Sequence, residues 1–236
     1  MSGLELACYG PARCCSSNIS MKPVDIRKLY ICGAGGMGRE VLELARTVNV
    51  IEQRWDWIGL VEKAGVGSVG CEVAGTDELL MQASVTTDVA VGIADPEVKS
   101  ALVARLMKNP HLHFPSLVHP QAYISPGARI GVGVIVQWGC WVSTNVELDD
   151  FSFVNVACHI GHDVSIGRYT SLMVNVDLGG HVQVGEGCYF GTKSTVVPSV
   201  RIGRGVRVGA ASLVAYDVVD GLTVIGNPAR YIDPRT

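Results

Sequence analysis

The C-terminal half of the chain carries an uninterrupted six-residue repeat. Every sixth residue from 118 to 214 is apolar, and the series is Val118, Ile124, Ile130, Val136, Val142, Leu148, Val154, Ile160, Ile166, Leu172, Leu178, Val184, Phe190, Val196, Ile202, Val208 and Val214. Helices repeat about every 3.6 residues and strands about every two, so neither gives this period. A hexapeptide β-helix does, because each hexad forms one short strand and three hexads close a coil.

A second column of small or β-branched residues lies four positions after each apolar anchor and includes Cys140, Cys158 and Cys188. We expect the anchors to point inward and to stack on the coils above and below, about 4.8 Å apart. The repeat is long enough for between five and six coils. Glycine often follows the anchor, as at Gly161, which predicts a positive φ or a close backbone approach at a corner. A repetitive β-sandwich would need turn signals every 8–12 residues or so, and the sequence lacks them.

The segment before the repeat has the pattern of alternating strands and helices. Strands are predicted at 28–32, 57–61 and 88–92, and helices at 39–47 and 96–107. This order predicts a half-Rossmann α/β domain over residues 28–110, followed by an all-β left-handed parallel β-helix over 111–216 and a C-terminal segment over 217–236. Residues 1–27 are expected to be a disordered leader or to follow a misassigned start codon.

A glycine-rich turn follows the first predicted strand. Gly33, Gly35 and Gly38 match the pattern GxGxxG, with Gly36 between them. Such glycines let backbone amides approach a phosphate at the start of a helix. Glu62 lies where a ribose-binding acid would, after the second strand. Three interpretations stay open: a dinucleotide site, for which the domain is short; a site for one nucleotide, such as that of a nucleotide-sugar; or a tight turn without a ligand.

Composition excludes several classes of partner. The 236 residues carry a net charge of −3, and only 17% are charged, so we expect no binding to nucleic acid or to a membrane surface. No apolar run is long enough to span a bilayer, and residues 1–20 do not resemble a signal peptide. The eight cysteines show neither metal-ligand nor disulfide spacing. We therefore expect a cytoplasmic protein.

One histidine stands out within the coils. Steps of 18 residues stack Thr144, His162, Gly180 and Pro198 along one edge, so that a residue without a side chain lies above an imidazole. This arrangement predicts room for a ligand beside His162, and Asp163 is a candidate to orient the ring. A three-histidine zinc site with His159 and His181 is the competing interpretation. We expect no metal, because His159 and His162 straddle a corner.

Several segments together resemble one enzyme family. They are the run 155–167 with His162 and Asp163, the turn 33–38, the segment Gly75-Thr76-Asp77, the entry 115–120 and the ending 224–230. In order and spacing they are similar to the sialic-acid O-acetyltransferase (NeuD-like) family, over Lys28 to Arg230. That family includes N-acetyltransferases acting on nucleotide-linked amino sugars. The resemblance implies a homotrimer, with acetyl-CoA bound between neighbouring β-helices and the sugar nucleotide held by the front domain.

The resemblance also implies roles for single residues. His162 would act as general base, supported by Asp163. Family members that act on UDP-linked amino sugars carry two acids after the second strand, whereas this chain has Glu62 alone. Some members have a second histidine near acetyl-CoA where this chain has Ser171. The candidate substrate-binding residues are Gly33, Gly35, Gly36, Gly38, Glu62 and Gly92.

The candidate cofactor-binding residues are Ser171, Gly179, Gly180, Lys193, Arg204 and Arg207. A backbone N–H near Gly179 and Gly180 is expected to stabilise the oxyanion, because no side chain obstructs the approach there. The three cations lie in the basic part of the chain beyond Phe190, where the phosphates of the cofactor would bind.

These observations predict an acetyl-CoA-dependent acetyltransferase that acts directly on an amino or hydroxyl group of a sugar, which is expected to be nucleotide-linked. Three alternatives stay open. They are a hexapeptide acyltransferase for serine or another non-sugar amine, a γ-carbonic-anhydrase-like metalloenzyme, and a trimeric scaffold without catalysis.

Overall fold

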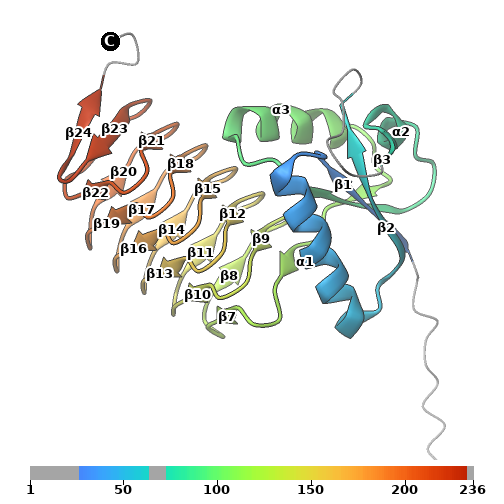
Figure 1. The fold of residues 1–236 in the computed structure, drawn as a ribbon, viewed down its shortest axis with the longest axis horizontal. Coiled ribbons are helices and arrows are strands. Elements are labelled where there is room, and N and C mark those ends of the chain that lie inside the picture. The colour runs from blue at the N-terminus through green and yellow to red at the C-terminus, as the bar shows by residue number, and fades with distance from the viewer. Residues whose placement is uncertain (1–26, 64–72, 233–236) are drawn as a thin grey trace, which may run out of the picture.

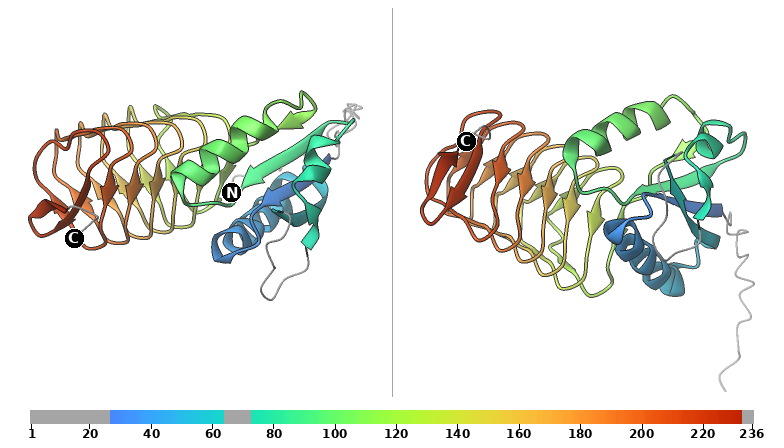
Figure 2. Two further views of the ribbon diagram at one scale, coloured as in Figure 1. Left: turned by 90° about the horizontal axis from the view of Figure 1, so that it is seen from above. Right: turned by 45° about the horizontal axis from the view of Figure 1, so that its top comes forward.

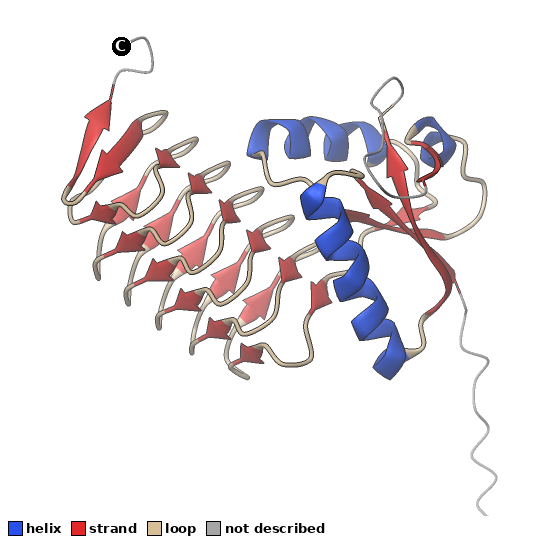
Figure 3. Cartoon of the chain, viewed as in Figure 1, coloured by secondary structure: helices blue, strands red, loops and turns tan. Residues whose placement is uncertain are grey.

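The computed structural model describes residues 27–63 and 73–232, and the expected leader lies outside them except for Arg27. An α/β domain is followed by a parallel β-helix, as Figures 1 and 3 show. The fold class predicted from the repeat and the glycine-rich turn is therefore confirmed.

The front domain is built on one parallel sheet with the order β3-β2-β1-β4-β5. Its strands are β1 (Arg27–Cys32), β2 (Trp55–Glu62), β3 (Val73–Thr76), β4 (Thr87–Val91) and β5 (Leu112–His113). Its helices are α1 (Gly36–Glu52), α2 (Glu78–Met81) and α3 (Pro96–Leu106). The three predicted strands and two predicted helices are present, and α1 begins earlier and ends later than the pattern indicated. The short elements β3, α2 and β5 carry too few residues for a periodic signal.

The two long helices are positioned by different local signals. Val41 and Leu44 of α1 are buried against Leu29 of β1. Helix α3 begins at a strong N-cap: the carboxylate of Asp95 accepts hydrogen bonds from the N–H groups of Glu97 (3.0 Å) and Val98 (3.1 Å), and proline stands at the first helical position.

Three sheets form the sides of the β-helix, and their strands are parallel except for the last one, β24. The first contains β6 (Leu117–Val118), β9 (Ile135–Val136), β12 (Phe153–Val154), β15 (Ser171–Leu172), β18 (Tyr189–Phe190), β21 (Arg207–Val208), β23 (Thr223–Gly226) and β24 (Ala229–Ile232). The second contains β7 (Tyr123–Ile124), β10 (Trp141–Val142), β13 (His159–Ile160), β16 (Asp177–Leu178), β19 (Thr195–Val196) and β22 (Leu213–Val214). The third contains β8 (Arg129–Ile130), β11 (Glu147–Leu148), β14 (Ser165–Ile166), β17 (Gln183–Val184) and β20 (Arg201–Ile202).

The stacking follows the predicted 18-residue coil. His159 pairs with Asp177 and Ile160 with Leu178, in parallel register. The anchors form one continuous core, in which Ile160 is 1% exposed, and Cys140, Cys158 and Cys188 are buried in the same core. Up to Val214, the first and second sheets hold six strands each and the third five, which agrees with between five and six coils for the repeat.

Two reasons were predicted for the glycines that follow the anchors: a positive φ, or a close approach of the backbone of the next coil. A Cβ on Gly161 would lie 2.7 Å from the backbone nitrogen of Gly180, so close backbone approach explains that glycine. Of the two reasons predicted for glycine at this position, the close approach applies to Gly161 and the positive φ does not. Positive φ occurs three residues after the anchor instead, at Gly133 and also at Asn145, Asp163 and other residues with side chains.

The coil pattern changes at both ends of the β-helix. After Val214 the spacing shortens, because Ile202 pairs with Val218 and Val208 with Val224, and β24 then closes the sheet by antiparallel pairing with β23. Coil structure thus continues past residue 216. At the other end, β5 pairs with β4, so the front sheet reaches residue 113 rather than ending at 110.

The front domain packs against the first sheet of the β-helix. Leu117, Ile135 and Phe153, which point outward from that sheet, share a buried core with α1 and β1. Figure 2 shows the coils extending away from this contact. Within residues 27–63 and 73–232, no helix has the length and apolar character needed to cross a membrane.

Candidate active site

His162 lies in the turn between β13 and β14, at the edge where the second and third sheets meet. Its Nδ1 atom is 2.7 Å from Oδ2 of Asp163. The other carboxylate oxygen of Asp163 accepts a hydrogen bond of 3.1 Å from the side-chain amide of Asn145. The hydrogen bonds to His162 and Asn145 hold the pKa of Asp163 below its usual value, so this carboxylate stays charged beside the imidazole.

His181 is a member of this cluster that the sequence argument did not assign. Its ring meets that of His162 edge to face, with the ring centroids 4.9 Å apart, and its Nδ1 atom is 3.8 Å from Oδ2 of Asp163. The signal was present in the repeat: steps of 18 residues place Asn145, Asp163 and His181 in one column, next to the column of His162. The structure therefore brings two histidines to one carboxylate.

Gly180 is the expected neighbour of His162. A Cβ on Gly180 would lie 2.6 Å from Nε2 of His162, so the imidazole itself fills the space that the missing side chain leaves. At Gly179 a Cβ would meet Pro198. Gly180 thus lets the ring approach the next coil closely, while the His162 side chain as a whole stays exposed.

A shallow groove of about 430 Å³ runs beside His162 over the second sheet. Trp141, His159 and Asp177 line it from successive strands, and Gly161 and Gly179 form part of its floor. His159 and Asp177 contact each other, with 3.0 Å between Nδ1 and Oδ1. The groove combines an aromatic wall with polar groups, as ligand sites usually do.

The other candidate cofactor residues lie away from His162 within one chain. Lys193 is exposed in the turn from the first sheet to the second, and Arg204 is exposed in the turn from the third sheet to the first. Arg207 is paired with Asp95, with 2.8 Å between Nη2 and Oδ2. Ser171 is fully buried and accepts a hydrogen bond of 2.9 Å from Nζ of Lys99.

Ser171 and Arg207 lie away from His162 because both stand on the same side of the β-helix, the side that the front domain covers. Both point outward from the first sheet in the column of Leu117, Ile135 and Phe153, and the front domain covers that column. In the isolated chain they contact Lys99 and Asp95 of the front domain rather than the groove of His162.

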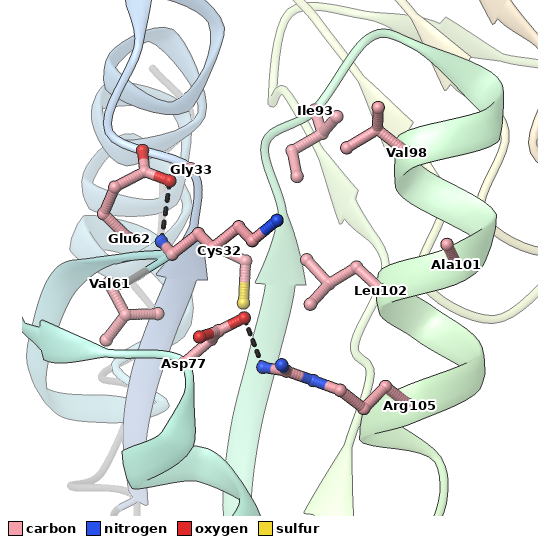
Figure 4. A pocket seen from close by; sticks show the side chains of 11 residues that line it. Cys32, Gly33, Val61, Glu62, Asp77, Ile93, Val98, Ala101, Leu102 and Arg105 are labelled. Carbon is pink, nitrogen blue, oxygen red and sulfur yellow. Dashed lines mark hydrogen bonds and ion pairs between the residues drawn. The ribbon is translucent and has the colours of Figure 1, made fainter. Parts of the chain in front are cut away.

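A second cavity, of about 530 Å³, lies at the carboxyl ends of β1 and β2, facing α3 (Figure 4). Ligands usually bind at this end of a parallel sheet. Leu102 and other apolar side chains form one wall, and Glu62, Asp77 and Arg105 contribute charge. Asp77 forms an ion pair with Arg105. Oε2 of Glu62 accepts a hydrogen bond of 2.6 Å from the backbone N–H of Ala34, which ties this acid to the glycine-rich turn.

The glycines of that turn divide into two groups. Gly33 has a φ of +99°, and a Cβ on Gly38 or Gly92 would collide with the backbone of Gly33 or Gly38, so these three are required by the turn itself. At Gly35 and Gly36 an added Cβ would meet none of the described atoms within 4 Å. Their lack of a side chain is therefore not explained by packing, and it leaves the start of α1 accessible.

The front domain matches a known family model. The model is described as the PglD N-terminal domain and covers residues 28–106. A curated relative, GDP-perosamine N-acetyltransferase of Escherichia coli O157:H7, is 28% identical over 209 residues, which are 85% of this chain and 94% of the relative.

Two solved structures match both parts of the fold. The acetyltransferase domain of PglB from Neisseria gonorrhoeae FA1090 is 31% identical, with a TM-score of 0.81 over 87% of this chain and 100% of that domain. PerB from Caulobacter crescentus, solved in complex with CoA and GDP-perosamine, is 28% identical, with a TM-score of 0.78 over 88% of this chain and 98% of PerB. With the fold and the domain order, these matches show that the chain belongs to the family of sugar acetyltransferases that carry a hexapeptide-repeat β-helix.

Proposed function

We propose that the protein transfers the acetyl group of acetyl-CoA to the amino group of a nucleotide-linked sugar, with His162 as the general base. The observation that carries the proposal is the contact between Nδ1 of His162 and the charged carboxylate of Asp163, at the groove that His162 lines. The relatives support the cofactor and the substrate class: the PglB domain has been solved with acetyl coenzyme A, and PerB with CoA and GDP-perosamine.

The contact with Asp163 determines what the imidazole can do. The carboxylate accepts the Nδ1 hydrogen, so Nε2 carries a lone pair that can accept a proton. As the amine of the sugar attacks the thioester carbonyl, its proton passes to Nε2, and the CoA thiolate leaves when the tetrahedral intermediate collapses. Asp163 then stabilises the imidazolium. General base catalysis of this kind typically contributes about 10²–10⁴-fold.

The tetrahedral intermediate needs a hydrogen-bond donor for its oxyanion. Of the two expected residues, Gly179 already donates its N–H to the carbonyl of Val196 (2.9 Å) in the sheet ladder. We therefore propose that the N–H of Gly180, next to the His162 ring, donates the hydrogen bond to the oxyanion. Lys193 and Arg204, both exposed, remain the candidate partners of the CoA phosphates, whereas Arg207 is engaged by Asp95.

The front cavity is the proposed site of the nucleotide. The accessible backbone at Gly35 and Gly36 would receive the phosphates at the start of α1, and Glu62 would hold the turn in place. The protein is proposed to act as a homotrimer, because the front cavity and His162 lie on different sides of one β-helix. A substrate held in one chain would then reach His162 of a neighbouring chain.

The test is release of free thiol from acetyl-CoA in the presence of a panel of nucleotide-linked amino sugars. The panel includes sugars that offer only hydroxyl groups, which would reveal O-acetylation. We expect His162→Ala to lower kcat by about 10²–10⁴-fold. His111→Ala serves as the matched control, because His111 is an exposed histidine of the front domain. A His162→Ala variant that keeps more than about a tenth of the wild-type kcat would contradict the proposal.

A further inference from the structure

We infer that His162, Asp163 and His181 form a binding site for a divalent transition-metal ion of the zinc type, and that the bound ion inhibits the enzyme. Each residue offers one ligand atom, and these atoms all lie within 4.8 Å of one another. Within the part of the chain that the structure describes, no other group of three histidine, cysteine or acidic side chains comes together in this way.

The donor set fits zinc. Two imidazole nitrogens and one carboxylate oxygen are ligands that zinc accepts at about 2.0–2.2 Å, with the fourth position left open. Ligand atoms around one tetrahedral zinc lie about 3.3 Å apart at such bond lengths. Oδ2 of Asp163 is 2.7 Å from Nδ1 of His162 and 3.8 Å from Nδ1 of His181, so these two spacings bracket the required one, and every pair of ligand atoms lies within 4.8 Å.

The β-helix holds the three residues in place, while their side chains keep freedom to adjust. Asp163 and His181 occupy the same turn position in successive coils, with φ of 59° and 63°. The N–H of His181 donates to the carbonyl of His162 (2.9 Å), which ties the two turns together. The side chains of His162 and His181 are 54% and 60% exposed, so small side-chain rotations can bring all three ligand atoms to one ion.

This site differs from the three-histidine site considered from the sequence. His159 contacts Asp177, on the strands of the second sheet. That pair offers two ligand groups rather than three. His159 therefore serves as the control residue for metal binding. It is an exposed histidine that contacts a carboxylate, and it lies three residues before His162.

Inhibition follows from the residues that the ion would occupy. A metal ion bound to His162 and Asp163 replaces the hydrogen bond that orients the imidazole, and its charge opposes protonation of the ring. The inhibitory consequence rests on the proposed function, whereas binding of the ion does not.

Binding is tested on the full chain, freed of metal with a chelator, by calorimetric titration with Zn²⁺ and by the absorption spectrum of Co²⁺ as a probe. We expect about one ion per chain for the wild type and for His159→Ala. His181→Asn should bind at least about tenfold more weakly, because one of three ligands is lost. Asparagine tolerates the left-handed φ of this position, as Asn145 shows two coils away in the same column. Equal affinity in His181→Asn and the wild type, or an absence of binding at micromolar Zn²⁺, would overturn the inference.

Inhibition is tested by adding Zn²⁺ to the thiol-release assay. The concentration for half-inhibition should match the dissociation constant of the wild type and should rise at least about tenfold in His181→Asn. Tight binding without inhibition would overturn the inhibitory part of the inference. A chain that binds Zn²⁺ but transfers no acetyl group would refute the proposed function and leave the metal site standing.

Discussion

Lys99 is a basic residue that is buried at the contact between the two domains. It lies between α3 and the first sheet with 1% of its surface exposed, donates from Nζ to the hydroxyl of Ser171 (2.9 Å), and has its Nζ 6.0 Å from the centre of the Phe153 ring. Burial lowers the pKa of Lys99 to about 7, and the opposing effect of Asp95 is smaller. The contact between the two domains therefore contains a group that titrates near neutral pH.

This burial predicts how stability depends on pH. Below pH about 7 Lys99 is charged in both the folded and the unfolded chain, whereas above it the folded chain loses the proton and the unfolded chain keeps it up to about pH 10.5. The unfolded state binds more protons in that window, so the free energy of unfolding rises with pH, by up to about 1.4 kcal/mol per unit. Lys99→Met removes this dependence. Urea unfolding should show the difference between wild type and variant growing by about 2 kcal/mol from pH about 7 to about 9. Parallel pH profiles would contradict the prediction.

Ser171 and His181 show what the repeat can and cannot predict about single residues. The hexad register tells which side chains point outward, and it placed His162, Gly180 and the buried cysteines correctly on the coil. It does not tell which outward column another domain covers, so Ser171 was expected at the cofactor and lies instead under Lys99. The apolar run of Leu117, Ile135 and Phe153 in that column was the available signal for the covered face.

At the scale of single elements, the turns of the β-helix are not marked by glycine alone. The left-handed position is occupied by Asn145, Asp163 and His181 as well as by Gly133. Asparagine and aspartate tolerate this conformation better than most residues do. The position of the strands was predictable from the anchors, but the conformation of each corner was not, because the residue type there varies from coil to coil.

Helix α1 begins without the usual polar cap. Its N-cap is Gly35, with φ of −71° and ψ of −173°, no side chain caps the helix, and its first turn contains no acidic residue. Any residue can adopt these angles, and aspartate and serine are good N-caps. The absence of a side chain at this end therefore favours a ligand over a structural role.

Two substitutions at Gly35 separate these roles. Gly35→Asp and Gly35→Ser should each leave stability unchanged or raise it by a few tenths of a kcal/mol, because both residues cap helices. Gly35→Asp should weaken binding of the nucleotide-sugar at least about tenfold, since a carboxylate repels phosphate, whereas Gly35→Ser should weaken it much less. Thermal unfolding and calorimetric titration with the nucleotide-sugar measure the two effects. Equal binding by the two variants would mean that phosphate does not approach this turn.

At the scale of the whole molecule, the three sheets separate the two candidate sites. The front domain covers the first sheet, whereas His162 lies at the edge between the second and third sheets, which is opposite the first in a three-sided coil. The outer face of the second sheet exposes Tyr123 and Trp141, whose rings stack with centroids 4.2 Å apart. One chain alone thus leaves an aromatic face exposed and its two sites apart.

A closed trimer would resolve both features, and complementation between two inactive variants tests it. His162→Ala removes the base but keeps nucleotide binding by the front domain, and Gly35→Asp keeps the base but impairs nucleotide binding. If each site combines the cavity of one chain with His162 of its neighbour, one quarter of the sites in trimers assembled at random from equal amounts of the two chains are intact, because each of the two contributors is correct half of the time. With the nucleotide-sugar well below the dissociation constant of the wild type, co-expressed variants should therefore recover about a quarter of the wild-type rate, against about a tenth or less for Gly35→Asp alone and about a hundredth or less for His162→Ala alone. A co-expressed mixture that is no more active than its parents, although its mass is that of a trimer, would place both halves of the site in the same chain.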